Sequence, residues 1–123
     1  VKEGVSAGFP SPAADFEELK LSLDHLLIKN KEATFYAKAS GNSMTGAGID
    51  DGDILVIDRS LEPRNNAVAV CFIDGEFTVK RIKKTDKAVF LMPENPSYAP
   101  IQIEPHNEFI IWGIVTYVIK QIK

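Results

Sequence analysis

Cysteine and histidine are scarce in this sequence of 123 residues, which holds one Cys and two His. Cys71 cannot form a disulfide within the chain, and small secreted domains usually carry an even number of cysteines. The protein is therefore expected in the cytoplasm, with Cys71 as a small core residue. His25 and His106 stand beside no metal or Ser-His-Asp motif and are expected at the surface. Neither a metal site nor any other cofactor is expected.

Long apolar runs and an excess of positive charge are also missing. The longest apolar run, Phe109 to Ile119, is much shorter than the ~20 residues of a membrane-spanning helix. The N-terminus has no apolar segment like that of a secretory signal. Because 14 basic residues face 17 acidic ones, the net charge is −3. Without a basic face, neither membrane binding nor direct sequence-specific DNA binding is expected.

The composition present is that of one globular domain, with 45% hydrophobic and 25% charged residues. Val1 to Pro12 is rich in Gly, Pro, Ser and Ala and follows no period. We therefore expect a flexible arm at residues 1–14, followed by a single domain at 15–123. The chain begins with Val in place of Met, which suggests a processed start.

Periodicity predicts one helix followed by a β domain. From Asp15 to Leu27, apolar residues recur at helical spacing. Short β-branched or aromatic runs then predict seven strands: Thr34–Ala39, Ile54–Asp58, Ala67–Ile73, Glu76–Ile82, Ala88–Met92, Ile101–Ile103 and Phe109–Lys120. Asp74-Gly75 between two of these runs predicts a type I′ hairpin. The fold expected is mostly β, with bent antiparallel sheets, an N-terminal helix and the arm.

Lys80 is the first candidate for a catalytic residue. Side chains alternate along a strand, so Lys80 and Arg81 point to opposite faces of the sheet. If Lys80 faces an apolar surface, desolvation lowers its pKa, and a neutral amine can act as a general base. The alternative is a solvated lysine on a half-exposed strand, which is the commoner situation.

Ser43 is the second candidate, because Ser40-Gly41-Asn42-Ser43-Met44 forms a sharp turn after a predicted strand. A serine nucleophile needs a base for its proton and backbone N–H groups for the oxyanion, and such a turn can supply those donors. Alternatively, the Ser43 hydroxyl only caps a short helical turn. The local pattern fits both interpretations.

Four segments in order resemble the Ser-Lys self-cleaving peptidase domain of the LexA/UmuD family. They are Ser40–Met44, Gly52–Val56, Asp74–Ile82 and Leu91–Ile101, followed by a similar Gly113-Ile114-Val115. The resemblance implies that Ser43 is the nucleophile and Lys80 the neutral base. It also implies an oxyanion hole made by the backbone N–H groups of Ser43 and Asn42.

The arm is similar to the segment around the cleavage site in the UmuD branch of the family, which serves a translesion DNA polymerase. Gly8-Phe9-Pro10-Ser11-Pro12 follows the pair Ala7-Gly8, so the resemblance implies self-cleavage between Ala7 and Gly8. It further implies an SOS-response role in mutagenic translesion synthesis. The implied partners are a RecA filament on single-stranded DNA, a UmuC-like polymerase subunit and a second copy. The apolar strand from Phe109 to Ile119 is expected to offer this second copy an edge.

The sequence departs from the family pattern at two places. Asn42 replaces a frequent Asp or Glu, and Asn66-Ala67 replaces Gly-Asp at a turn where Asn tolerates positive φ. Two alternative functions remain open. The first is the C-terminal peptidase and dimerisation domain of a LexA-like or phage-type repressor. The second is an interaction module with an unreactive Ser43 and an ordinary Lys80.

Overall fold

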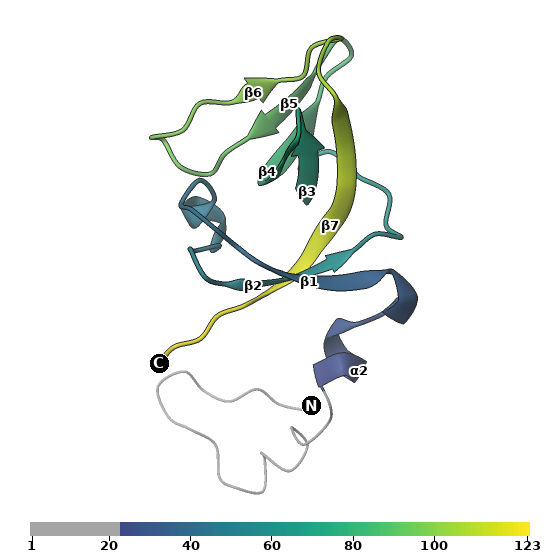
Figure 1. Ribbon diagram of the computed structural model, residues 1–123, viewed down its shortest axis with the longest axis vertical. Coiled ribbons are helices and arrows are strands. Elements are labelled where there is room, and N and C mark those ends of the chain that lie inside the picture. The colour runs from purple at the N-terminus through teal and green to yellow at the C-terminus, as the bar shows by residue number, and fades with distance from the viewer. Residues whose placement is uncertain (1–22) are drawn as a thin grey trace, which may run out of the picture.

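The computed structural model describes residues 23–123 (Figure 1). Helical structure within them is limited to α2 (Leu23–Leu27) and two short 3-10 helices, η2 (Lys31–Ala33) and η3 (Thr45–Ala47). No helix in residues 23–123 has the length and apolar character needed to cross a membrane. The expected arm with Ala7 and Gly8, and the first part of the expected helix, lie outside the described residues.

Seven strands form the body of the domain. They are β1 (Thr34–Lys38), β2 (Ile54–Asp58), β3 (Val68–Ile73), β4 (Glu76–Lys84), β5 (Val89–Met92), β6 (Ile101–Gln102) and β7 (Phe109–Ile119). All belong to one antiparallel sheet in the order β1-β2-β7-β3-β4-β5-β6. The expected mostly β fold is confirmed, with one continuous sheet in place of several.

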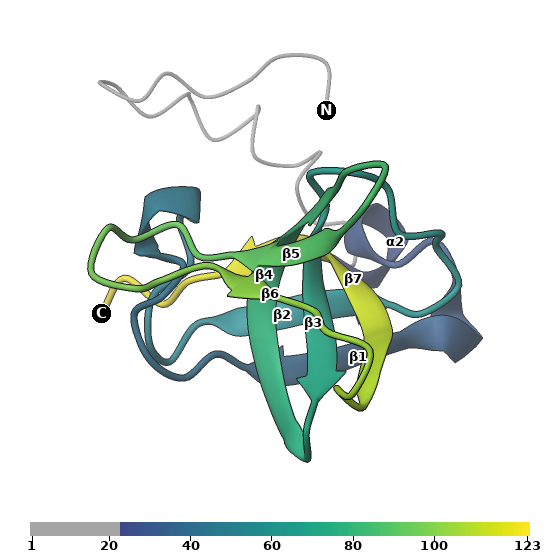
Figure 2. The same ribbon diagram turned by 90° about the horizontal axis from the view of Figure 1, so that it is seen from above.

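β7 links the two parts of this bent sheet, as Figures 1 and 2 show. Its first half pairs with β3 and its second half with β2, and Ile114 is paired with both Ala69 and Asp58. Within residues 23–123, each half of β7 thus has a strand partner on one side only, and the expectation that this strand offers an edge to a second copy stays a prediction. An apolar strand of 11 residues is long enough to pair with two neighbours in succession. The edge strands are β1 and β6.

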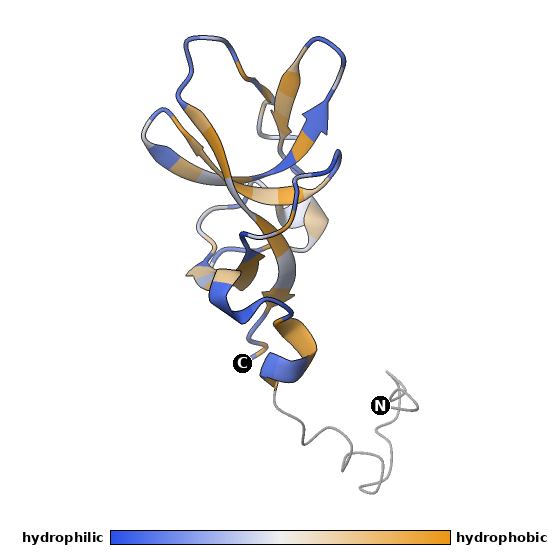
Figure 3. Cartoon of the chain, turned by 90° about the vertical axis from the view of Figure 1, so that its right-hand side faces the viewer, coloured by the Kyte–Doolittle hydropathy of each residue, from blue (hydrophilic) through white to orange (hydrophobic). Residues whose placement is uncertain are grey.

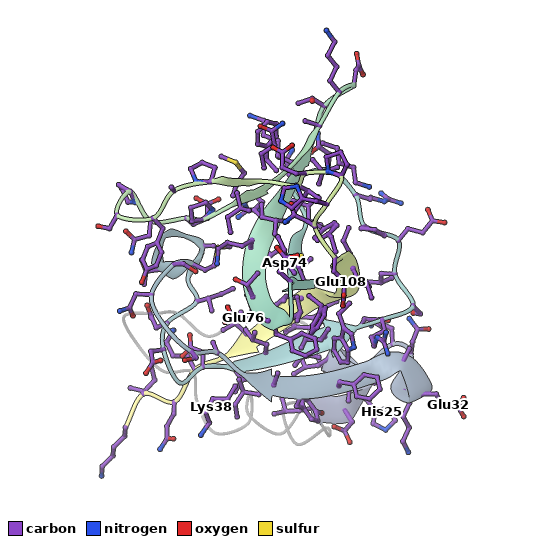
Figure 4. All side chains as sticks on the ribbon, turned by 45° about the horizontal axis from the view of Figure 1, so that its top comes forward. His25, Glu32, Lys38, Asp74, Glu76 and Glu108 are labelled. Carbon is purple, nitrogen blue, oxygen red and sulfur yellow. The ribbon has the colours of Figure 1, made fainter. Side chains whose placement is uncertain are left out.

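The turns bear out two local expectations. Asp74 and Gly75 have φ values of 48° and 90°, which confirms the positive-φ hairpin turn between β3 and β4. Asn66, before β3, has φ of 71°, so it does adopt the left-handed backbone that its turn requires. Figure 4 shows the acidic side chains around the β3–β4 turn, where Asp74 accepts a hydrogen bond from the backbone N–H of Glu108 at 2.9 Å.

Two apolar clusters form the core of the domain. The strands are more hydrophobic than the loops that connect them (Figure 3). The first cluster packs around β2 and the segment after β1, and it contains Ala39, Met44, Ile49, Leu55, Ile57 and Val70. The second packs around β3, β4 and β5, and it contains Ala69, Cys71, Ile82, Leu91 and Ile114. Cys71 is thus a buried core residue, as expected. His25 and His106 are exposed, also as expected.

Candidate active site

One cleft of about 540 Å³ lies between the two parts of the sheet. Its walls come from the end of β1, the segment that follows it, the start of β4, Tyr98 and Trp112. Lys38, at the end of β1, also lines the cleft and is labelled in Figure 4. Both Ser43 and Lys80 are on its surface. The structure therefore places the two residues singled out from the sequence in the same cleft.

The segment 39–48, here called the serine loop, leaves β1 through a tight hydrogen-bonded junction. The backbone N–H of Ala39 donates to the Asp53 carbonyl at 2.7 Å, and the Gly52 N–H donates back to the Ala39 carbonyl at 2.8 Å. Gly41 has φ of 85°, a left-handed conformation that glycine adopts without strain. Its N–H donates to Asp51 Oδ1 at 2.8 Å. These contacts fix the start of the loop against the turn before β2.

Met44 and the following turn hold the other side of the serine loop. Met44 is 3% exposed and packs in the first apolar cluster, directly after Ser43. The short helix η3 takes Met44 as its N-cap residue and has no side-chain capping bond. The alternative that Ser43 merely caps a helical turn is therefore wrong. Its hydroxyl is instead directed at Lys80.

Lys80 lies on β4, an interior strand that pairs with β3 and β5. Its Nζ donates to Ser43 Oγ at 2.9 Å, to Thr78 Oγ1 at 2.7 Å and to the Val79 carbonyl at 3.1 Å. Thr78 and Lys80 share a face because side chains alternate along the strand. Thr78 was not singled out from the sequence, although its place two residues before Lys80 was a usable signal.

Burial defines the electrostatics of Lys80. The residue is only 8% exposed, so the alternative of a solvated lysine is wrong. Desolvation disfavours the ammonium form and lowers the pKa of Lys80, with a smaller opposing effect from Cys71. The same burial raises the pKa of the Cys71 thiol to about 11. A larger fraction of Lys80 is thus neutral at a given pH than for a lysine in water.

The segment Glu94-Asn95, which follows β5, contacts the serine loop at Ser43 and at Asn42. The Glu94 N–H donates to the Ser43 carbonyl at 2.8 Å, and Asn95 Nδ2 donates to the Asn42 carbonyl at 2.8 Å. Within residues 23–123, no acceptor contacts the backbone N–H groups of Asn42 or Ser43. The carbonyls of these two residues are therefore paired while their N–H donors remain available.

A hydroxyl in contact with a buried amine can lose its proton to that amine as it attacks a carbonyl carbon. Lysine takes this part in some serine peptidases, where others use histidine. In this bent β domain, one cleft holds a serine hydroxyl in contact with a buried lysine amine, which is the pair of groups that such chemistry needs.

The chain belongs to the Peptidase S24-like family, whose model matches residues 1–116. This confirms the resemblance to the LexA/UmuD family read from the sequence motifs.

Several curated proteins are similar to this chain over most of its length. Protein MucA of Salmonella typhimurium is 42% identical over 114 residues, which are 92% of this chain and 77% of MucA. Protein ImpA of Shigella flexneri is 39% identical over 123 residues, covering 95% of this chain and 79% of ImpA. The LexA repressor of Bordetella avium is 34% identical over 116 residues, covering 94% of this chain but 54% of the repressor.

Proposed function

We propose that the protein is a self-cleaving serine peptidase in which Ser43 is the nucleophile and Lys80 the general base. The observation that carries the proposal is the 2.9 Å contact between Lys80 Nζ and Ser43 Oγ, made by a lysine that is 8% exposed. Burial lowers the pKa of Lys80, so the amine can accept the hydroxyl proton. Family membership supports the same activity.

The bond cut in this proposal is the peptide bond between Ala7 and Gly8. Ser43 Oγ attacks the Ala7 carbonyl carbon while Lys80 takes the Ser43 proton. The backbone N–H groups of Ser43 and Asn42, which have no acceptor among residues 23–123, stabilise the oxyanion. The Lys80 ammonium then gives its proton to the Gly8 amine as the C–N bond breaks. Water attacks the resulting ester, with Lys80 again as base, and regenerates Ser43.

The cellular role proposed is that of a UmuD-like subunit of the SOS response. Self-cleavage is stimulated by a RecA filament on single-stranded DNA, which increases the population of molecules with the scissile bond in the cleft. The cleaved form acts as a cytoplasmic homodimer with a UmuC-like polymerase subunit in mutagenic translesion synthesis. The similarity to MucA and ImpA over more than three quarters of their lengths supports this assignment.

The LexA relative keeps a second role open, that of the C-terminal peptidase and dimerisation domain of a repressor. The match covers 54% of that repressor, so a repressor of this type has a further part beyond the matched residues. The full gene decides between the two roles. An upstream segment of some 70 or more residues with a helix-turn-helix pattern supports the repressor.

The chemical proposal is tested by incubating the chain at alkaline pH and measuring its mass. Ser43→Ala and Lys80→Ala should abolish cutting between Ala7 and Gly8. Matched controls are Ser97→Ala and Lys83→Ala, which remove an exposed serine and an exposed lysine of β4 and should cut at the parent's rate. Processing by the two site variants at the control rate would overturn the assignment.

The pH dependence tests the role of Lys80. Because the neutral amine is the reactive form and burial lowers its pKa, the rate should rise with pH and level off below the ordinary lysine value of 10.5. A rate that only begins to rise near 10.5 would contradict a buried base.

Reactivity of Ser43 tests the third possibility, an interaction module without activity. A fluorophosphonate, which phosphonylates activated serines with loss of fluoride, should label the parent at Ser43 and leave the Lys80→Ala variant unlabelled. Equal, slow labelling of both proteins would favour the interaction module.

Sedimentation at several concentrations tests the proposed homodimer separately, and a monomer at every concentration argues against it.

A further inference from the structure

Ser43 lies on a loop, so its position relative to Lys80 depends on what holds that loop. Glu94 contacts it through both of its main-chain polar groups: its N–H donates to the Ser43 carbonyl at 2.8 Å, and its carbonyl accepts from the Gly46 N–H at 2.7 Å. The serine loop is thus bound to one residue by hydrogen bonds at two points. These two points are on either side of Met44.

Close packing leaves little freedom at this contact. A Cβ atom placed on Gly46 would lie 2.6 Å from the Glu94 carbonyl oxygen, which is below any normal contact distance. The backbones of the serine loop and of Glu94 therefore touch directly. A displacement of Glu94 must displace the loop or break both hydrogen bonds.

The Glu94 side chain is held in turn by the strand that carries Lys80. Arg81 Nε donates to Glu94 Oε1 at 2.6 Å, and Arg81 Nη1 donates to the Asn66 carbonyl at 2.7 Å. Arg81 follows Lys80 on β4 and projects to the opposite face of the strand. Arg81 therefore connects the Glu94 carboxylate to β4, one residue from the proposed base, and to the turn before β3.

We propose that Glu94 is a positioning residue that sets the distance between Ser43 and Lys80. Its main chain fixes the serine loop, and its carboxylate is fixed by Arg81 beside Lys80. This inference rests on the proposed function and deepens it. The two side chains are 32% and 36% exposed, and ion pairs of such exposure add little to global stability. Their importance is the geometry of the site.

A double-mutant cycle tests the inference with Arg81→Ala, Glu94→Ala and the pair together. A misplacement of about 1 Å can lower a rate by about a hundredfold, so we expect each single variant to lower the alkaline plateau of self-cleavage by about tenfold or more. The double variant should be no slower than the singles, because all three lose the same contact. The matched control is Lys84→Ala, which removes another cation of β4 that bonds to a carbonyl.

Three readouts separate positioning from a structural role. Positioning lowers the plateau rate while the urea midpoint stays near that of Lys84→Ala and the pH of half-maximal rate moves little. The charge reversal, Arg81→Glu with Glu94→Arg, should restore part of the rate. A structural role instead lowers the midpoint and leaves the rate per folded molecule unchanged. That outcome, or additive losses in the double variant, overturns the proposal.

Amide hydrogen exchange provides a test that does not require cleavage. In a Ser43→Ala background, Arg81→Ala should accelerate exchange of the Gly46 amide severalfold and leave the amides of β3 unchanged. Unchanged Gly46 exchange would overturn the inference even if the rate fell. If the parent protein does not cleave at all, the proposed function fails, and the exchange measurement alone still decides whether Arg81 and Glu94 hold the loop.

Discussion

Replacing Gly46 with alanine measures how tightly the serine loop is packed against Glu94. Gly46 is not among the described residues with positive φ, so its backbone itself accepts alanine. The obstacle is the Glu94 carbonyl oxygen, 2.6 Å from the position of the new Cβ atom, and this oxygen belongs to the backbone and cannot rotate away. Alanine must therefore separate the two segments.

The magnitude follows from what this separation breaks. Two hydrogen bonds join the segments, from Gly46 N–H to Glu94 and from Glu94 N–H to Ser43, and each contributes about 1 kcal/mol. Overpacking adds about 1–3 kcal/mol, and the reduced entropy of the unfolded chain returns about 0.4–1 kcal/mol. We expect Gly46→Ala to lower the free energy of unfolding by about 2–5 kcal/mol and to slow self-cleavage.

Urea unfolding followed by the fluorescence of Trp112, the single tryptophan, measures this loss. Gly48→Ala is the matched control, because Gly48 has φ of 80° and open space around its Cβ position. Its cost is backbone strain alone, about 1 kcal/mol. A Gly46→Ala variant within about 0.5 kcal/mol of the parent, or one less damaged than Gly48→Ala, would refute the reasoning.

Three further predictions follow from the contacts of single side chains. Thr78→Val removes an acceptor that binds the Lys80 ammonium more strongly than the neutral amine, so it should move the pH of half-maximal cleavage downward and lower the plateau rate about fivefold. Lys120→Met removes the cation that lowers the pKa of Asp53, so stability measured by urea unfolding should fall above about pH 4. The difference from the parent should vanish as the pH falls through the lowered Asp53 pKa. The Cys71 thiol, with a pKa of about 11 and no exposed surface, should react with an aromatic disulfide at pH 8 only as fast as the protein unfolds.

Local patterns in the sequence were sufficient to find the strands. Period-2 runs and turn residues fall where all seven strands occur, and Asp74-Gly75 does form the predicted hairpin turn. The partners of β7 could not be predicted in this way, because pairing depends on contacts between residues far apart in the chain. An apolar strand reads the same whether it lies at an edge or between two neighbours. The described part of the predicted helix is α2, whose Leu23 and Leu26 are largely exposed.

The site was predictable to the extent that its residues lie in recognisable motifs. Ser43 and Lys80 were named from a turn and a strand, and the structure brings their side chains together. Their catalytic roles, and those of Asn42, Ala7 and Gly8, stay predictions. The contacts of Glu94 with the serine loop could not be foreseen, because they are made by main-chain atoms that no side-chain pattern specifies.

The bend of the sheet at β7 is what brings the serine and the lysine together. The serine loop is attached to the β1–β2 part of the sheet, through the Ala39–Asp53 junction, whereas Lys80 belongs to the β3–β4 part. Among the strands of residues 23–123, β7 alone pairs with strands of both parts. Where β7 crosses β2, a Cβ atom on Gly113 would lie 2.5 Å from Ile57 Cγ2. The two strands can therefore lie this close only because residue 113 is a glycine. The distance between the Ser43 hydroxyl and the Lys80 amine therefore depends on how β7 crosses β2 as well as on the two residues themselves.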